Sequence, residues 1–160
     1  YDGDQDFKRP PYFVTVGLTI HDKYVEFGLG AIHTSPPVAE QEISSLADAA
    51  DWYSELTDDG DVMILGDFNC GCNYVRKRAY ANLELYTRKE FVWLVDNDAD
   101  TTVRSGTCCP YDRIVVRGAE LMDAIDTDSA DVDLFDMAYE LSEEEAIKIS
   151  DHYPVFLKFN

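Results

Sequence analysis

Three polar residues stand together near the carboxyl end of the sequence, in the stretch ISDHYPVFLKF. Ser150, Asp151 and His152 come just before Pro154 and an apolar run. A strand entering a core needs only a turn at this point, and Asp and Pro are ordinary turn formers. An adjacent carboxylate and imidazole can also transfer protons or bind a metal ion. Which interpretation applies depends on the other polar side chains that the fold brings nearby.

Six polar residues flank short apolar runs, either after the end of a run or just before its start. They are His33 after YVEFGLGAI, Asp67 and Asn69 after VMIL, Asp112 before RIVV, and Asp151 and His152 before PVFLKF. If the runs are antiparallel strands, the end of one lies beside the start of its neighbour, and all six residues collect along one edge of one sheet. The competing explanation is that Asp and Asn favour such flanking turns anyway.

An edge of this composition suits the hydrolysis of a phosphoester. Carboxylate and amide oxygens are hard ligands for Mg²⁺, Mn²⁺ or Ca²⁺. His33 and His152 would remove a proton from an attacking water and supply one to the leaving oxygen, while a cation neutralises charge on the phosphoryl group. Asp112 is the candidate that fixes the tautomer of His152. No partner for His33 is evident in the sequence.

The hydrophobic pattern predicts the elements that position these residues. We expect strands at residues 12–20 and 24–32 forming a hairpin, a helix at 38–56, strands at 62–65, 114–116 and 155–159, a strand or core loop at 91–95, an exposed basic helix and loop at 76–88, a solvated acidic loop at 123–133, and a helix at 143–149. Several strands with few helices predict an α+β fold, with a mixed or antiparallel sheet packed on helices.

The composition is that of about one globular domain: 160 residues, 46% apolar and 28% charged. No run of about 18 apolar residues is present, so no membrane span is expected. The chain opens on Tyr1 without a basic and then apolar stretch, so no signal peptide is expected within it. The net charge of −19 argues against nucleic-acid binding through a basic face, but not against an enzyme whose bound cations reverse the local sign.

The four cysteines form two groups, Cys70 with Cys72 and Cys108 with Cys109. Their spacing is poor for a zinc site, so disulfides in an oxidising compartment are the better interpretation. The spacing alone does not fix the pairing.

These residues and their surroundings resemble the deoxyribonuclease I family, within the endonuclease/exonuclease/phosphatase superfamily. The matching stretches, in family order, are RPPYFV, AIHTSP, DVMILGDFN with CNYV, FVWL with DADTT, CPYDRIVV and ISDHYPV. They extend over residues 9–159. GDFN and SDHYP alone are typical of the superfamily, whereas CNYV and CPYDRIVV point to the deoxyribonuclease I branch.

The resemblance implies a role for each matched position. His33 and His152 would be the acid/base pair with Asp112 orienting His152; Asp67, Asn69 and Asp151 would hold or lie beside Mg²⁺ (or Mn²⁺); Asp100 and Thr102 would belong to a Ca²⁺ loop; Arg9, Tyr111 and Thr107 would face the substrate; and Cys72 would pair with Cys109. Arg104 stands where this loop is expected to offer an oxygen ligand. Cys70 and Cys108 are extra, and form either a second bridge or free thiols.

The resemblance also implies that part of the family domain lies outside this chain. In the family, a preceding portion supplies a first sheet, a metal-binding Glu and the Glu that orients the first histidine. Residues 1–160 would then form a single partial domain, the C-terminal part of a four-layer α/β/β/α sandwich with its first sheet largely missing. This would explain why His33 lacks a partner. Tyr1 to Gly3 would begin where the family has another calcium loop.

The implied protein is a secreted, divalent-metal-dependent endonuclease that hydrolyses DNA to 5′-phosphate ends and is a monomer when complete. The 160-residue chain by itself is expected to be catalytically incomplete. One alternative is a fragment that acts only as a structural or binding module. Another is a phosphodiesterase of the same superfamily acting on a lipid head group, against which CNYV and CPYDRIVV argue. These motifs carry no information on actin binding.

Overall fold

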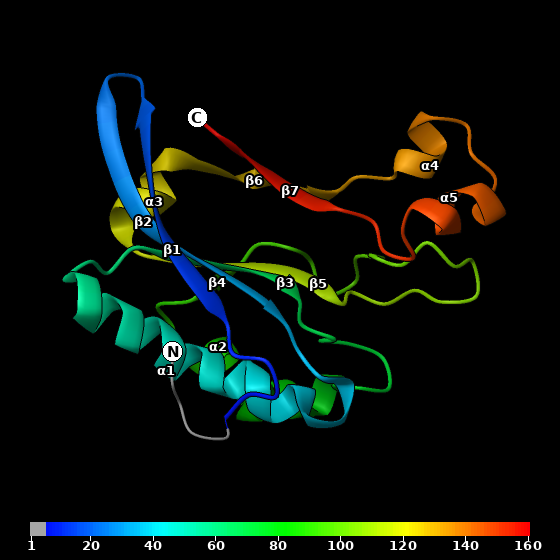
Figure 1. Cartoon of the computed structure of the whole chain (residues 1–160), viewed down its shortest axis with the longest axis horizontal. Coiled ribbons are helices and arrows are strands. Elements are labelled where there is room, and N and C mark those ends of the chain that lie inside the picture. Colours follow the sequence, from blue (N-terminus) through cyan, green and yellow to red (C-terminus); the bar gives the residue numbers. More distant parts are fainter. Residues whose placement is uncertain (1–5) are drawn as a thin grey trace.

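A five-stranded mixed sheet forms the centre of the computed structural model, which describes residues 6–160 (Figure 1). The strands lie in the order β1-β2-β3-β5-β4. Their bounds are Tyr12–Ile20 for β1, Lys23–His33 for β2, Val62–Asp67 for β3, Val92–Trp93 for β4 and Asp112–Arg117 for β5. One loop assigned from the sequence, at Tyr1 to Gly3, lies outside the described residues. The predicted α+β class is confirmed.

Helices cover one face of this sheet, and a second, two-stranded sheet lies on the other side (Figure 1). The remaining elements are η1 (Pro36–Val38), α1 (Ala39–Thr57), η2 (Lys77–Asn82), α2 (Glu84–Thr87), α3 (Ala119–Ala124), β6 (Ile125–Val132), α4 (Phe135–Ala138), α5 (Glu143–Ile149) and β7 (Val155–Phe159). No helix among residues 6–160 combines the length and the apolar character needed to cross a bilayer.

The long helix α1 packs closely against β2. Its apolar stripe, which includes Ile43, Leu46 and Tyr53, is buried as its helical spacing predicts. Gly28 on β2 permits the close approach, because a Cβ there would lie 2.2 Å from the Tyr53 ring. The opposite face of the sheet packs against α3, β6 and β7, so β2 and β3 are covered on both sides.

The pairing of β2 with β3 makes the predicted mixed or antiparallel sheet a mixed one, and differs from the antiparallel case on which the single edge was argued. The two strands are parallel, with His33 opposite Asp67. α1 lies between them in the chain, and a crossover helix returns the chain to the same edge, which gives parallel neighbours. β3 and β5 are antiparallel, with Asp67 opposite Asp112. The carboxyl ends of β2 and β3 therefore meet the amino end of β5 in one row.

The predicted acidic loop at 123–133 is wrong: most of it is strand β6, paired with β7. Its burial alternates along the strand, with Asp126 and Asp128 exposed and Ile125 buried. The frequent acidic residues on the solvent side obscured this two-residue period in the sequence. β7 therefore belongs to the second sheet, and Asp151 and His152, just before it, do not lie on the edge of the five-stranded sheet. His152 reaches that edge from the second layer and bridges to Thr102.

Candidate active site

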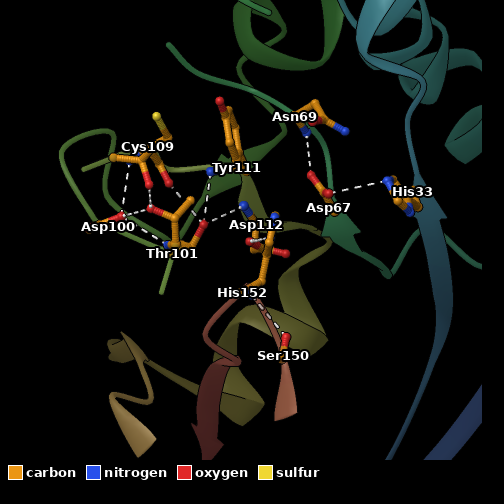
Figure 2. Close-up of polar contacts among 12 residues, drawn as sticks. His33, Asp67, Asn69, Asp100, Thr101, Cys109, Tyr111, Asp112, Ser150 and His152 are labelled. Atoms are coloured by element: carbon orange, nitrogen blue, oxygen red, sulfur yellow. Dashed lines mark hydrogen bonds and ion pairs between the residues drawn. The ribbon is translucent and has the colours of Figure 1, made fainter. Parts of the chain in front are cut away.

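His33, Asp67 and Asp112 form a row across three adjacent strands (Figure 2). The Nε2 atom of His33 lies 3.4 Å from Oδ2 of Asp67. The inference that His33 has no partner in this chain is therefore wrong. The His33 side chain is largely exposed and the Asp67 side chain mostly buried, so the imidazole faces solvent while the carboxylate lies deeper.

His152 completes the group from the second layer. Its Nδ1 atom lies 2.7 Å from Oδ2 of Asp112, as expected for a carboxylate that orients an imidazole. This hydrogen bond is the main reason why the pKa of His152 lies above its usual range. The amide N–H of His152 donates to the Ser150 hydroxyl at 3.0 Å. The Ser-Asp-His stretch thus forms a local turn and also presents an oriented imidazole.

The GDFN segment shapes the end of β3. Gly66 has φ +136°, and a Cβ there would lie 1.9 Å from the Ile32 carbonyl oxygen, so only glycine fits. Beyond the strand, the Asn69 amide N–H donates to Oδ1 of Asp67 at 2.8 Å, and Asn69 Nδ2 donates to the Thr34 carbonyl at 3.0 Å. Because Nδ2 of Asn69 is engaged in this hydrogen bond, the side-chain oxygen Oδ1 is the atom that could bind a cation.

The carboxylates of the row suit a hard cation. Asp67, Asp112 and His152 each offer one ligand atom, and these atoms lie within 4.8 Å of one another. Burial, and next the negative charge of Asp112, raise the pKa of Asp67. A cation at this point would offset both effects, because it stabilises the ionised carboxylate. The residues therefore fit a divalent metal. Asp151, predicted as a further ligand, is exposed and lies outside this three-residue group.

The predicted substrate contacts lie around this group. The Arg9 guanidinium donates to the Thr34 carbonyl at 3.4 Å, the same oxygen that Asn69 contacts. The Tyr111 ring stacks on the His152 imidazole, with centroids 5.9 Å apart. Tyr74, not singled out in the sequence, extends this stack at 5.4 Å from Tyr111 and is exposed. It lies in CNYV, so the motif itself was the available signal.

The loop assigned to calcium is closed by its own hydrogen bonds. Oδ1 of Asp100 accepts from the amide N–H and the hydroxyl of Thr102, at 3.0 and 2.6 Å, and from the Cys109 amide at 3.1 Å. The hydroxyls of Thr102 and Thr107 lie 2.8 Å apart. The oxygens expected to bind calcium or substrate are thus gathered in one place, and their functional assignment stays a prediction.

The disulfide between Cys72 and Cys109 is confirmed, and it joins the loop after GDFN to the segment before β5. Cys70 and Cys108 are free, the first buried and the second exposed. Of the two possibilities for the extra cysteines, the structure therefore has free thiols.

Fold and site together define a layered α+β protein with a carboxylate and imidazole centre at a sheet edge. The chain belongs to the Endonuclease/Exonuclease/phosphatase family, whose sequence pattern matches residues 2–152. It is 42% identical over 158 residues to deoxyribonuclease gamma of Rattus norvegicus, covering 98% of this chain and 51% of the relative. It is 42% identical over 154 residues to deoxyribonuclease-1 of Bos taurus, covering 96% and 54%. The resemblance to the deoxyribonuclease I family is confirmed.

A solved structure shares the fold at low sequence identity. D. rerio TDP2, complexed with single strand DNA product, matches with a TM-score of 0.57 and 14% identity, covering 92% of this chain and 61% of that chain. This likeness supports the sandwich architecture. The chain spans about half the length of the curated relatives it matches.

Proposed function

We propose that the protein carrying this chain is a divalent-metal-dependent endonuclease that hydrolyses phosphodiester bonds of DNA and leaves 5′-phosphate ends. The observation that carries the proposal is the convergence of His33, Asp67, Asp112 and His152, which are distant in sequence, in one continuous set of contacts. Relatives at about 40% identity that are named deoxyribonucleases support DNA as the substrate.

The two imidazoles carry the proton transfers in this proposal. Nδ1–H of His152 is directed at Asp112, so Nε2 of the neutral ring is free to exchange a proton with solvent or substrate. One imidazole takes a proton from the water that attacks phosphorus. As the bond from phosphorus to the 3′ oxygen breaks, the other, protonated imidazole gives its proton to that oxygen. The products are a 3′-hydroxyl and a 5′-phosphate.

Asp67 and the side-chain oxygen of Asn69 would hold Mg²⁺ or Mn²⁺, with Asp112 close by and the exposed Asp151 beside the ion rather than in the group around Asp67. A bound divalent cation supplies Lewis-acid stabilisation of the negative charge that grows on the phosphoryl oxygens. We assign Ca²⁺ to the loop that contains Asp100 and Thr102, where it would stiffen the approach to Tyr111.

The proposal also names the residues that contact DNA, the location of the protein and its oligomeric state. Arg9, Tyr111 and Thr107 would contact DNA, with Arg9 on a phosphate. The disulfide supports an oxidising compartment and hence a secreted protein. Residues 1–160 would form one partial domain, and the complete protein would be a monomer.

A plasmid-nicking assay on the natural full-length protein tests the proposal. We expect supercoiled DNA to be nicked with Mg²⁺ and Ca²⁺ and to stay intact with EDTA. His33→Gln and His152→Gln should each slow nicking by about 10²- to 10⁴-fold, the usual contribution of general acid–base catalysis. The matched control is His21→Asn, because His21 is exposed in the hairpin turn at the other end of β2, with φ 47°.

The ends of the cleaved DNA identify the bond that breaks. Ligation by a DNA ligase without prior kinase treatment requires 5′-phosphate ends, so we expect the nicks to be sealed directly. Intact plasmid under every metal condition, or unchanged nicking by both histidine variants, would contradict the proposal.

A further inference from the structure

One buried hydroxyl beside the site has no role in the chemistry described above. Thr101 lies between the two residues assigned to the calcium loop, and its exposed fraction is 0%. A buried hydroxyl costs free energy unless its hydrogen-bonding capacity is used. The contacts that use it lead directly to the catalytic group.

The Thr101 hydroxyl binds the segment that begins β5. Oγ1 donates to the Cys109 carbonyl at 3.1 Å. It accepts the amide N–H of Tyr111 at 3.0 Å and that of Asp112 at 3.2 Å (Figure 2). One oxygen atom thus holds the backbone that leads into Asp112, the carboxylate that orients His152.

The backbone of Thr101 binds the segment that carries His152. Its carbonyl accepts the amide N–H of Tyr153 at 2.9 Å, and the neighbouring Thr102 forms the bridge to His152. Asp112 belongs to the five-stranded sheet and His152 precedes a strand of the other sheet. Thr101 therefore touches both segments across the junction of the two layers.

Only a side chain with a hydroxyl on Cβ can make these bonds. Valine has nearly the same shape as threonine, but would take the hydroxyl away from the Asp112 N–H, whereas the Tyr111 N–H and the Cys109 carbonyl would keep their mutual hydrogen bond at 3.0 Å. Serine keeps the oxygen and loses one methyl group. A comparison of Thr101→Val with Thr101→Ser therefore separates the effect of losing the hydroxyl from the effect of losing side-chain volume.

We propose that Thr101 is a positioning residue whose hydroxyl sets the placement of Asp112 against His152. The inference rests on the proposed nuclease function, because proton transfer by His152 is the step that this positioning would serve. It concerns the chemical step rather than binding, since Thr101 is fully buried and the Tyr111 amide has a second hydrogen bond, to the Cys109 carbonyl at 3.0 Å, that does not need the hydroxyl.

Steady-state cleavage of DNA by the natural full-length protein tests this inference. Thr101→Val should lower kcat by about 10- to 100-fold, the size of effect that follows a misplacement of about 1 Å, and leave KM nearly unchanged. Thr101→Ser should restore most of kcat. The control for lost stability is Val62→Ala, a core truncation at the far end of β3 from Asp67, which should leave kcat unchanged at a temperature where all variants are folded.

A spectroscopic readout separates this inference from the proposed function. The His152 Nδ1 proton, shared with Asp112, should give a downfield proton NMR signal in the wild type and in Thr101→Ser, and lose or shift it in Thr101→Val. If the wild type does not cleave DNA, the proposed function fails, and the NMR comparison still decides whether Thr101 holds the pair. An unchanged signal in Thr101→Val, an unchanged kcat in that variant, or equal losses in the valine and serine variants would overturn the inference.

Discussion

Removal of the disulfide between Cys72 and Cys109 should destabilise the protein more than it impairs the site. The bridge joins residues separated by 37 positions. In the chain-entropy model, a loop of this length restricts the unfolded state by about 4 kcal/mol at 25 °C. A double variant with Cys72→Ser and Cys109→Ser should therefore lower the free energy of unfolding by about 3 to 4 kcal/mol. Cys108→Ser is the matched control, because Cys108 is exposed and free.

The row of His33, Asp67 and Asp112 should keep its arrangement after this change while the protein stays folded. The pairing of β3 with β5 holds Asp67 opposite Asp112, and the Phe68 amide donates to the Tyr111 carbonyl at 2.9 Å. These bonds do not involve the cysteines. We therefore expect the folded double variant to keep its nicking activity.

Urea unfolding followed by circular dichroism measures the stability, and plasmid nicking at a temperature where both proteins are folded measures the site. The slope of free energy against urea must be compared first, since the bridge also changes the unfolded state. A stability loss below about 1 kcal/mol would refute the loop-closure reasoning. A loss of activity in protein that is still folded would show instead that the bridge positions the row.

Two further substitutions neutralise a carboxylate, at Asp112 and at Glu42. With His152 as the imidazole that takes the proton from water, Asp112→Asn should move the acid limb of the pH–rate profile to lower pH, because the Asp112 carboxylate holds the pKa of His152 above its usual range. The plateau should fall by up to about 10⁴-fold, as when the orienting carboxylate of a Ser-His-Asp triad is neutralised. The hydrogen bond between Asp112 and His152 adds stability that is fully present below the pKa of the unfolded imidazole and is lost as pH rises through the higher folded pKa. The difference in free energy of unfolding between wild type and Asp112→Asn, measured in urea titrations, should therefore shrink from pH 5 to pH 9. A constant difference would contradict this assignment. Glu42→Gln should lower the free energy of unfolding in urea by about 1 to 3 kcal/mol. The buried Glu42 carboxylate accepts the amide N–H groups of Lys8 and Ser35, each at 2.6 Å, and a glutamine would turn its own NH₂ toward one of them. A stability equal to that of wild type would mean that the two segments are held by other contacts.

The order of strands and helices in the first half could be predicted because its patterns are strong. The α1 stripe and the apolar runs of β2 and β3 have the periods of their elements and are long enough to be unambiguous. The same order also contains the signal for parallel pairing, since a strand, a helix and a second strand in one sheet form a crossover. The argument for a single edge assumed antiparallel neighbours, because it considered the strand ends without the helix between them.

The contacts within the site were only partly predictable. Asp112 beside His152 followed from the chemistry that an imidazole needs, and it is confirmed at 2.7 Å. The contact between His33 and Asp67 depends on the register of β2 against β3, and a shift of one residue would turn one side chain to the other face. Sequence alone does not fix that register. Thr101 was missed because a buried threonine in a polar turn has no pattern that distinguishes it from a solvated one.

The distribution of the arginines bears on why a protein of net charge −19 would need metal ions to act on DNA. Arg88 and Arg117 both bind Asp51, at 2.7 and 2.6 Å, and so join α1 to the end of α2 and to β5. Arg113 is completely buried and donates to the Val95 carbonyl at 3.0 Å. These three cations hold the fold and are not available to phosphate. The long-range field therefore repels DNA, and attraction at the row of carboxylates has to come from bound cations. For the proposed nuclease, the rate of nicking should therefore rise steeply with divalent-ion concentration, because each bound ion reverses the sign of the potential where the scissile phosphate lies. A protein that binds DNA through a basic face would not need such ions for attraction.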